Sequence, residues 1–163
     1  MKVFTLIFTF SIIVDLLQAT PTLITRHTIQ TNQSSTLNSV EGEGCNYKIT
    51  IETSCYSPPS TTDQIDLLFA DAHGTEVLVP RLDSIASGMF DQCTTSIFNI
   101  TAKVCIDKIC KVFVYRRGSN GWIPKTITVN DYMHPPLAVY LNASIPNDGL
   151  GYGRNLCKLP SNK

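Results

Sequence analysis

Apolar and polar side chains alternate along much of the chain with a period of two. In residues 46–53, Tyr47, Ile49 and Ile51 fall on one face and polar side chains fall on the other. This period is typical of a half-buried β-strand, whereas an amphipathic helix repeats about every 3.6 residues. Comparable runs predict further strands at 64–70, 76–79, 96–100, 110–115, 125–129 and 137–141.

Turn-forming segments separate these strands. Pro, Gly, Asn, Asp and Ser gather at 57–60, 71–74, 117–121 and 134–136, and such clusters end strands and start turns. Seven or eight short strands without a helical repeat indicate an all-β domain, an antiparallel sandwich or barrel. We allow for one short helix at 82–90.

The N-terminus has the pattern of a secretory signal peptide. A basic start at Lys2 precedes an apolar run over 3–17, and the small residue Ala19 stands at the expected cleavage position. The run includes Asp15 and is shorter than the roughly 18 to 20 apolar residues that cross a bilayer. We therefore expect residues 1–19 to be removed and the mature chain to be secreted without a transmembrane segment.

Composition divides the rest of the chain into an arm, a domain and a tail. Residues 20–44 hold nine Ser or Thr and no aromatic residue, too little apolar area to offset chain entropy, and this predicts a disordered arm. The alternative is a local contact through Leu23, Ile24 and Ile29, or a propeptide. The compact domain is expected at 45–157, followed by a tail at 158–163.

Charge argues against nucleic acid as a partner. The chain has 13 basic and 13 acidic side chains and a pI near 6.8, whereas phosphate recognition needs clustered Lys and Arg.

The cysteines favour disulfides, because an even number in a small secreted chain usually forms bridges. Cys45 and Cys55 flank one strand, about 33 Å apart if extended, so they do not bridge each other. Cys105 and Cys110 are spaced more widely than a redox C-x-x-C motif, which favours a structural role. A Cys45–Cys157 bridge would join the domain ends, but fifteen pairings are open. The six candidates are Cys45, Cys55, Cys93, Cys105, Cys110 and Cys157.

Three sequons predict a glycoprotein. They begin at Asn32, Asn99 and Asn142. Asn99 lies between Phe98 and Ile100, and Asn142 follows an apolar residue, so both side chains should point outward if their apolar neighbours point inward.

A family resemblance rests on ordered segments of the domain. These are 45–55, 62–65, 69–74, 80–83, 90–93 and 121–124, including Thr62-Asp63, Phe90-Asp91-Gln92-Cys93 and Gly121-Trp122-Ile123-Pro124. The chain resembles the plant embryo-specific protein 3 family, secreted single-domain members of the PLAT (lipoxygenase-homology) superfamily. The resemblance covers nearly all of 45–157. It implies a sandwich of two four-stranded antiparallel sheets that contacts lipids, membranes or proteins in the apoplast of the seed embryo, without catalysis.

The resemblance also suggests calcium ligands. In calcium-binding relatives the ligands come from a Thr-Asp loop and from the turn after the next strand, which correspond here to Asp63 and to Asp71 with Glu76. The sequence departs from the pattern at Thr61, where Gly is common, and at His73, where an oxygen ligand would suit calcium better. Calcium prefers six to eight oxygen ligands, so this signal is weak.

Turn capping is the competing interpretation of the aspartates. Asp63 and Asp71 flank one predicted strand, and Asp side chains bind nearby backbone amides in turns. We favour this interpretation over paired acid catalysis. His27, His73 and His134 share no strand or helical face and have no metal-binding spacing, which predicts surface positions.

Trp122 allows two opposite interpretations. An exposed Trp beside Arg116 and Arg117 would insert into a lipid interface while the arginines face headgroups. A core Trp would instead close one end of the sandwich.

We thus expect a secreted noncatalytic binding module whose partner is a membrane lipid surface or an extracellular protein. The first alternative is an extracellular inhibitor or defence protein that presents the loop 57–62. The second is a hydrolase using Asp63 or His73, for which no catalytic constellation is visible.

Overall fold

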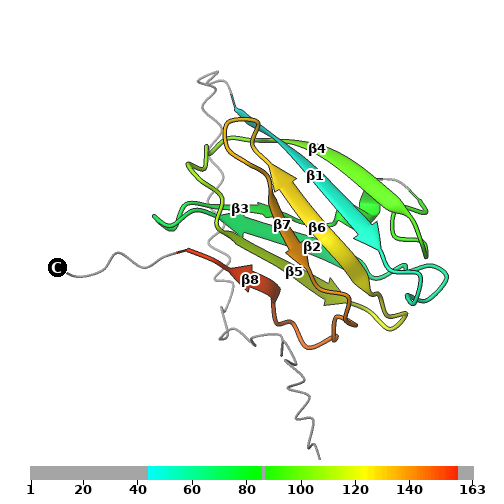
Figure 1. Cartoon of the computed structure of the whole chain (residues 1–163). Coiled ribbons are helices and arrows are strands. Elements are labelled where there is room, and N and C mark those ends of the chain that lie inside the picture. Colours follow the sequence, from blue (N-terminus) through cyan, green and yellow to red (C-terminus); the bar gives the residue numbers. More distant parts are fainter. Residues whose placement is uncertain (1–43, 86, 158–163) are drawn as a thin grey trace, which may run out of the picture.

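Two four-stranded antiparallel sheets pack face to face in the computed structural model, which describes residues 44–85 and 87–157 (Figure 1). Sheet A has the strand order β4-β1-β6-β7, and sheet B has the order β3-β2-β5-β8. The strands are β1 (Cys45–Thr53), β2 (Gln64–Ala70), β3 (Glu76–Val79), β4 (Thr95–Ala102), β5 (Lys111–Arg117), β6 (Pro124–Asn130), β7 (Leu137–Tyr140) and β8 (Tyr152–Asn155). The predicted antiparallel sandwich is confirmed.

Period-two alternation builds the core between the sheets. In sheet A, Ile49 of β1 lies opposite Phe98 of β4 and Val129 of β6. In sheet B, Leu67 of β2 lies opposite Val79 and Val114. These inward side chains are buried, and their burial is the main driving force for closing the sandwich.

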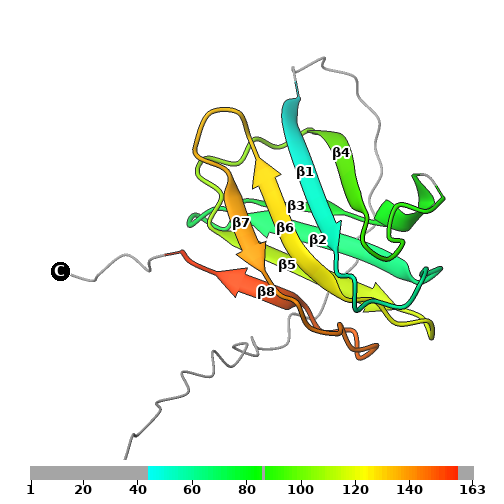
Figure 2. The same ribbon diagram turned by 45° about the vertical axis from the view of Figure 1, so that its right-hand side comes forward.

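The connections define two ends of the sandwich (Figures 1 and 2). The first end is where β1 and β5 finish, and the second end is where β1 and β5 begin. The first end carries the loops 54–63, 80–94, 118–123 and 141–151. The second end carries the loops 71–75, 103–110 and 131–136, together with residues 156–157.

The structure adds one strand to those predicted and shortens the helix. The sequence pattern does not predict β8, because its sequence Tyr-Gly-Arg-Asn shows no alternation of apolar and polar residues. The short helix considered at 82–90 is a single 3-10 turn, η1 (Leu82–Ser84).

All six cysteines form disulfides, as predicted. The pairs are Cys45–Cys105, Cys55–Cys93 and Cys110–Cys157. The Cys45–Cys157 pairing is therefore wrong. Both residues lie at the second end, but each pairs with one end of the segment 105–110 that passes between them.

Several expectations lie outside the described residues, namely the signal peptide at 1–19, Asn32, His27 and the tail at 158–163. The same holds for the arm at 20–44 except Gly44. Within 44–85 and 87–157, no helix has the length and apolar character needed to cross a bilayer.

Candidate functional site

A buried ion pair fixes the loops of the first end. Arg116 of β5 points inward in register with Ile65, and its guanidinium is paired with the carboxylate of Asp63. That carboxylate also accepts the backbone N–H groups of Asn120 at 3.0 Å and Gly121 at 3.1 Å. Burial acts to raise the pKa of Asp63, but these donors outweigh it and hold the pKa below its usual value. The prediction that Arg116 faces lipid headgroups is wrong, because its charge is satisfied inside the domain.

The turn after β5 depends on a glycine. Gly118 has a φ of 146°, and a Cβ atom there would lie 2.0 Å from the Oδ1 atom of Asp63. Its carbonyl oxygen accepts a hydrogen bond from Arg116 at 3.1 Å. The loop 118–123 therefore folds closely over the ion pair.

Trp122 belongs to the core. Its side chain is 0% exposed, and its Nε1–H donates to the hydroxyl of Thr53 at 3.2 Å. Its ring meets that of Phe90 edge to face, with centroids 5.1 Å apart. The interpretation as a core Trp is confirmed, and the interpretation as a lipid-inserting side chain is wrong. Arg117, one residue further along the alternation than Arg116, is exposed.

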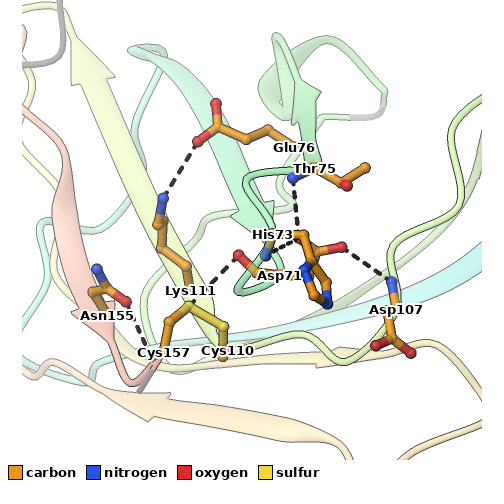
Figure 3. The surroundings of a disulfide bond; sticks show 9 residues. All are labelled: Asp71, His73, Thr75, Glu76, Asp107, Cys110, Lys111, Asn155 and Cys157. Atoms are coloured by element: carbon orange, nitrogen blue, oxygen red, sulfur yellow. Dashed lines mark hydrogen bonds and ion pairs between the residues drawn. A yellow bond between two sulfur atoms is a disulfide. The ribbon is translucent and has the colours of Figure 1, made fainter. Parts of the chain in front are cut away.

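Asp71 caps the turn between β2 and β3 at the opposite end of the molecule (Figure 3). Its Oδ1 atom accepts the backbone N–H groups of His73 at 2.8 Å and Thr75 at 3.0 Å, and its Oδ2 atom accepts that of Asp107 at 3.3 Å. Burial acts to raise its pKa, but these N–H donors lower it below the usual value. The turn-capping interpretation is confirmed, and the same side chain ties loop 71–75 to loop 103–110.

The proposed calcium ligands do not form one site. Asp63 and Asp71 lie at opposite ends of β2, about 26 Å apart at roughly 3.3 Å per residue. Glu76 is exposed at the second end, and its nearest charge is Lys111 at 3.4 Å. Because no single ion can touch both ends of a strand, the calcium site predicted at these three residues is wrong. Within 44–85 and 87–157, no group of three or more His, Cys, Asp or Glu is arranged to hold a metal.

The second end presents exposed apolar side chains on two adjacent loops. Val104 is 51% exposed, Tyr132 62% and Met133 85%. In both ribbon views the segment that follows β4 passes beside the β6–β7 turn (Figures 1 and 2). We call Val104 and Met133 the apolar tip, and Tyr132 lies beside Met133 in the loop 131–136.

Hydrogen bonds hold the first of these loops to the core. The hydroxyl of the buried Tyr47 accepts the backbone N–H of Ile106 at 2.8 Å and donates to the carbonyl of Val104 at 3.5 Å. Two disulfides, Cys45–Cys105 and Cys110–Cys157, bracket the same loop. The apolar tip therefore rests on a restrained backbone on this side.

Asp131 organises the second loop. Its Oδ1 atom accepts the N–H groups of Met133 at 2.9 Å and His134 at 2.8 Å, and its Oδ2 atom lies 2.9 Å from the Nδ1 atom of His134. Burial acts to raise the pKa of Asp131, but these contacts lower it below the usual value. The half-buried His134 also approaches Asp107 at 4.0 Å, which joins the two loops.

The charges around the apolar tip nearly cancel. The loops 103–110 and 131–136 together contain Lys103, Lys108, Asp107 and Asp131, so their formal charge is zero with His134 neutral. A contact made here would depend on apolar burial more than on attraction to anions.

The remaining predicted residues lie on the surface. Asn99 and Asn142 are both exposed, which confirms the predicted outward orientation, and His73 is exposed as expected. The sequence reasoning singled out Trp122 and missed Met133. The signal was present, because Tyr132 and Met133 stand in the turn segment that ends in His134-Pro135-Pro136, between two predicted strands.

Comparison with known proteins identifies relatives of the whole domain. The family model described as Embryo-specific protein 3 (ATS3) matches residues 31–157. Embryo-specific protein ATS3B of Arabidopsis thaliana is 36% identical over 120 residues, which cover 74% of this chain and 62% of that protein. Embryo-specific protein ATS3 of the same plant is 33% identical over 115 residues, which cover 69% of this chain and 54% of that protein. The chain thus spans little more than half the length of these relatives.

Two solved structures contain a similar fold as part of a longer chain. A LOX variant crystallised with arachidonate has a TM-score of 0.56 and 11% identity, and the match covers 72% of this chain and 18% of that chain. Alpha toxin from Clostridium absonum has a TM-score of 0.53 and 16% identity, and the match covers 72% of this chain and 33% of that chain. At these identities the likeness describes the fold alone.

Proposed function

The chain belongs to the embryo-specific protein 3 family and has a PLAT-like sandwich fold, and on this basis we propose that it is a secreted, noncatalytic module that binds the surface of lipid membranes. None of the family relatives named above carries the name of an enzyme. The signal-peptide pattern and the three disulfides support an extracellular setting.

The apolar tip is the observation that carries the proposal. Met133 and Val104 project from adjacent loops at the second end. The loop of Val104 is held by the Tyr47 hydroxyl and two disulfides, and the loop of Met133 is held by hydrogen bonds to the Asp131 carboxylate. An anchored loop loses little conformational entropy when it binds. An exposed Met and Val on such loops suit shallow insertion among lipid headgroups and the upper acyl chains.

The expected affinity is modest. Full burial of a Met side chain contributes about 1.5 to 3 kcal/mol, and Met133 is already 85% exposed in the free protein, so nearly all of this gain is available. Val104 contributes less, because about half of its surface is already covered. A total near 4 kcal/mol corresponds to a dissociation constant of about 1 mM in lipid, which describes reversible contact.

The test is co-sedimentation of the secreted, oxidised protein with liposomes of neutral and of anionic composition. We expect Met133→Asp to reduce partitioning at least about tenfold, because loss of 1.4 kcal/mol changes binding by that factor. Tyr56→Asp is the matched control, since Tyr56 is also 85% exposed but lies at the first end. Because the tip is nearly neutral, the two compositions should give similar binding.

Other outcomes are equally informative. Loss of binding on Tyr56→Asp with Met133→Asp unaffected would place the lipid contact at the first end. Absence of binding to every liposome composition would refute the lipid proposal and leave an extracellular protein as the partner.

A second candidate is the protein inhibitor, favoured by the clamped loop 57–62. Ser57 is buried and accepts the N–H of Ile123 at 3.1 Å, the carbonyl of Pro59 accepts the N–H of Gln92 at 3.0 Å, and the Cys55–Cys93 disulfide closes the base. Such a restrained loop suits a protease cleft. A panel of secreted proteases tests it, and the absence of inhibition at micromolar protein would remove this candidate.

A further inference from the structure

A hollow lies on the outward face of sheet A close to the second end. It has a volume of about 400 Å³ and is lined by Asn46, Tyr47, Asn99, Ile100, Thr101 and Tyr132. The strands β1 and β4 form its floor, where Asn46 pairs with Thr101 in register. Tyr132 reaches it from the loop 131–136.

The lining has the chemistry of a sugar site. None of the six side chains carries a formal charge at neutral pH, whereas amides and a hydroxyl supply hydrogen-bond donors and acceptors. The Tyr132 ring is 62% exposed and offers a flat apolar surface. A neutral ligand with polar edges and apolar faces fits this combination, and a pyranose ring has both.

The sequence supplies such a sugar from the chain itself. Asn99 begins a sequon that ends at Thr101, and because β-strand side chains alternate, both residues point away from the core. Asn99 is exposed, and among the described residues its side-chain amide takes part in no hydrogen bond. The Thr101 hydroxyl instead donates to the Oδ1 atom of Asn46 at 2.7 Å.

We infer that Asn99 carries an N-linked glycan whose first N-acetylglucosamine residues lie in this hollow against Tyr132. The inference rests on the proposed secretion. In the modification, the Nδ2 atom of Asn99 attacks C1 of the first sugar of a lipid-diphosphate-linked oligosaccharide. The new N–C1 bond replaces the C1–O bond to phosphate, the lipid diphosphate leaves, and the amide gives up one proton to a base of the transferase.

The position of Asn99 gives this glycan a protective task. β4 is an edge strand, and among the described strands it pairs only with β1. Its eight residues include no charge and no proline, whereas the other edge strands β3, β7 and β8 have four residues each. A long uncharged edge is a template for pairing with another chain. A glycan in the middle of β4 blocks that pairing.

Glycan occupancy is tested on the full chain secreted from eukaryotic cells, by mass spectrometry of intact protein and peptides. Thr101→Ser and Thr101→Ala form the matched pair, because the first keeps the sequon and the second destroys it at the same exposed position. We expect a glycan on Asn99 in the wild type and in Thr101→Ser, and none in Thr101→Ala. A bare Asn99 on the secreted chain overturns this inference alone, and a chain that stays inside the cells overturns the proposed secretion as well.

The contact between the glycan and the Tyr132 ring is tested by combining these variants with Tyr132→Ala. We expect Thr101→Ala to lower the melting temperature relative to Thr101→Ser by more when Tyr132 is present than when it is replaced, because the lost Thr101–Asn46 hydrogen bond affects both backgrounds equally. Tyr132→Phe should preserve the difference, since stacking needs the ring and not the hydroxyl. Equal effects of Thr101→Ala in both backgrounds would show that the sugar does not contact Tyr132.

Protection of the β4 edge is tested by measuring the oligomeric state with size-exclusion chromatography and light scattering. We expect Thr101→Ala to associate with itself, and Ile97→Lys on the same strand to restore the monomer, because a lysine on an edge strand opposes pairing. The double variant Thr101→Ala with Ile97→Lys should bind liposomes as the wild type does, because Met133 is unchanged. Its liposome binding therefore tests the proposed function independently of the glycan. A monomeric Thr101→Ala protein without the added lysine would refute the protective task.

Discussion

The ion pair between Asp63 and Arg116 allows a sharp prediction about stability. Removing the carboxylate in Asp63→Ala leaves the Arg116 guanidinium buried without its counter-ion. It also deprives the N–H groups of Asn120 and Gly121 of their acceptor. A buried charge left in this way is among the few changes that destabilise a domain strongly.

The size of the effect follows from burial. Arg116 and Asp63 have side chains 8% and 2% exposed, and removal of one partner of such a pair costs about 3 to 5 kcal/mol. Arg116→Met should cost a similar amount, because each partner keeps two backbone hydrogen bonds, Asp63 from Asn120 and Gly121 and Arg116 to the Gly118 and Ile145 carbonyls. The double variant should cost less than the sum of the single variants, since neither charge is then left alone.

Guanidinium unfolding under oxidising conditions measures these differences, with all three disulfides intact. The matched control is the exposed pair of Lys125 and Glu52, 2.6 Å apart with side chains 44% and 38% exposed. We expect Glu52→Ala to cost about 0.2 to 1 kcal/mol, the usual range for a surface pair. The m-value, which is the slope of the free energy of unfolding against denaturant concentration, should be equal in all variants, because the same surface is exposed on unfolding.

The reasoning is refuted if Asp63→Ala costs no more than Glu52→Ala. The carboxylate would then be dispensable to the loops of the first end. A role for Asp63 in binding an ion or partner would have to be considered again.

Three further predictions address the core, pH and calcium. Trp122→Ala should destabilise the domain by about 3 to 5 kcal/mol. In the wild type, liposomes should leave the fluorescence emission wavelength of this single, buried Trp unchanged, whereas a red shift would mean that the domain opens at the membrane. The pKa values of Asp63, Asp71 and Asp131 lie below their unfolded values, so the stability that these carboxylates contribute is present above about pH 4 and is lost as pH falls through the folded pKa values. Thermal melts from pH 7 to 2 should therefore show a melting temperature that falls in this acid range. A flat profile would contradict the assigned hydrogen bonds. Millimolar calcium should leave the melting temperature unchanged, because Asp63 and Asp71 lie at opposite ends of β2, and a rise of several degrees on calcium addition would reveal a site built from other oxygen atoms.

The strands could be predicted wherever alternation was regular. β1 and β2 lie within a residue of their predicted limits. β8 could not be found in this way, because its residues do not alternate between apolar and polar and the strand forms through pairing with β5. A four-residue strand of this kind is specified by its neighbours and not by its own residues.

The candidate site was predicted less well, because only part of it follows from the local alternation of residues and the rest depends on contacts between distant loops. The inward position of Arg116 could have been derived, since Val112, Val114 and Arg116 occupy the same face by the period of two. The disulfide pairing could not, because it depends on which loops meet at each end of the sandwich. The apolar tip likewise becomes visible only when the loops 103–110 and 131–136 are placed side by side.

The disulfides of the second end determine how the domain responds to mechanical tension. Cys45 is bonded to Cys105, and Cys157 to Cys110, with Cα–Cα distances of 5.2 and 4.9 Å. If both ends of the domain are pulled, the force runs through these two bonds and the short backbone between residues 105 and 110. That path reaches at most about 28 Å when taut, whereas the reduced chain could extend to about 400 Å. Under tension the strands of both sheets lie outside the force-bearing path, so the sandwich keeps its shape until a reductant opens one of the two bonds.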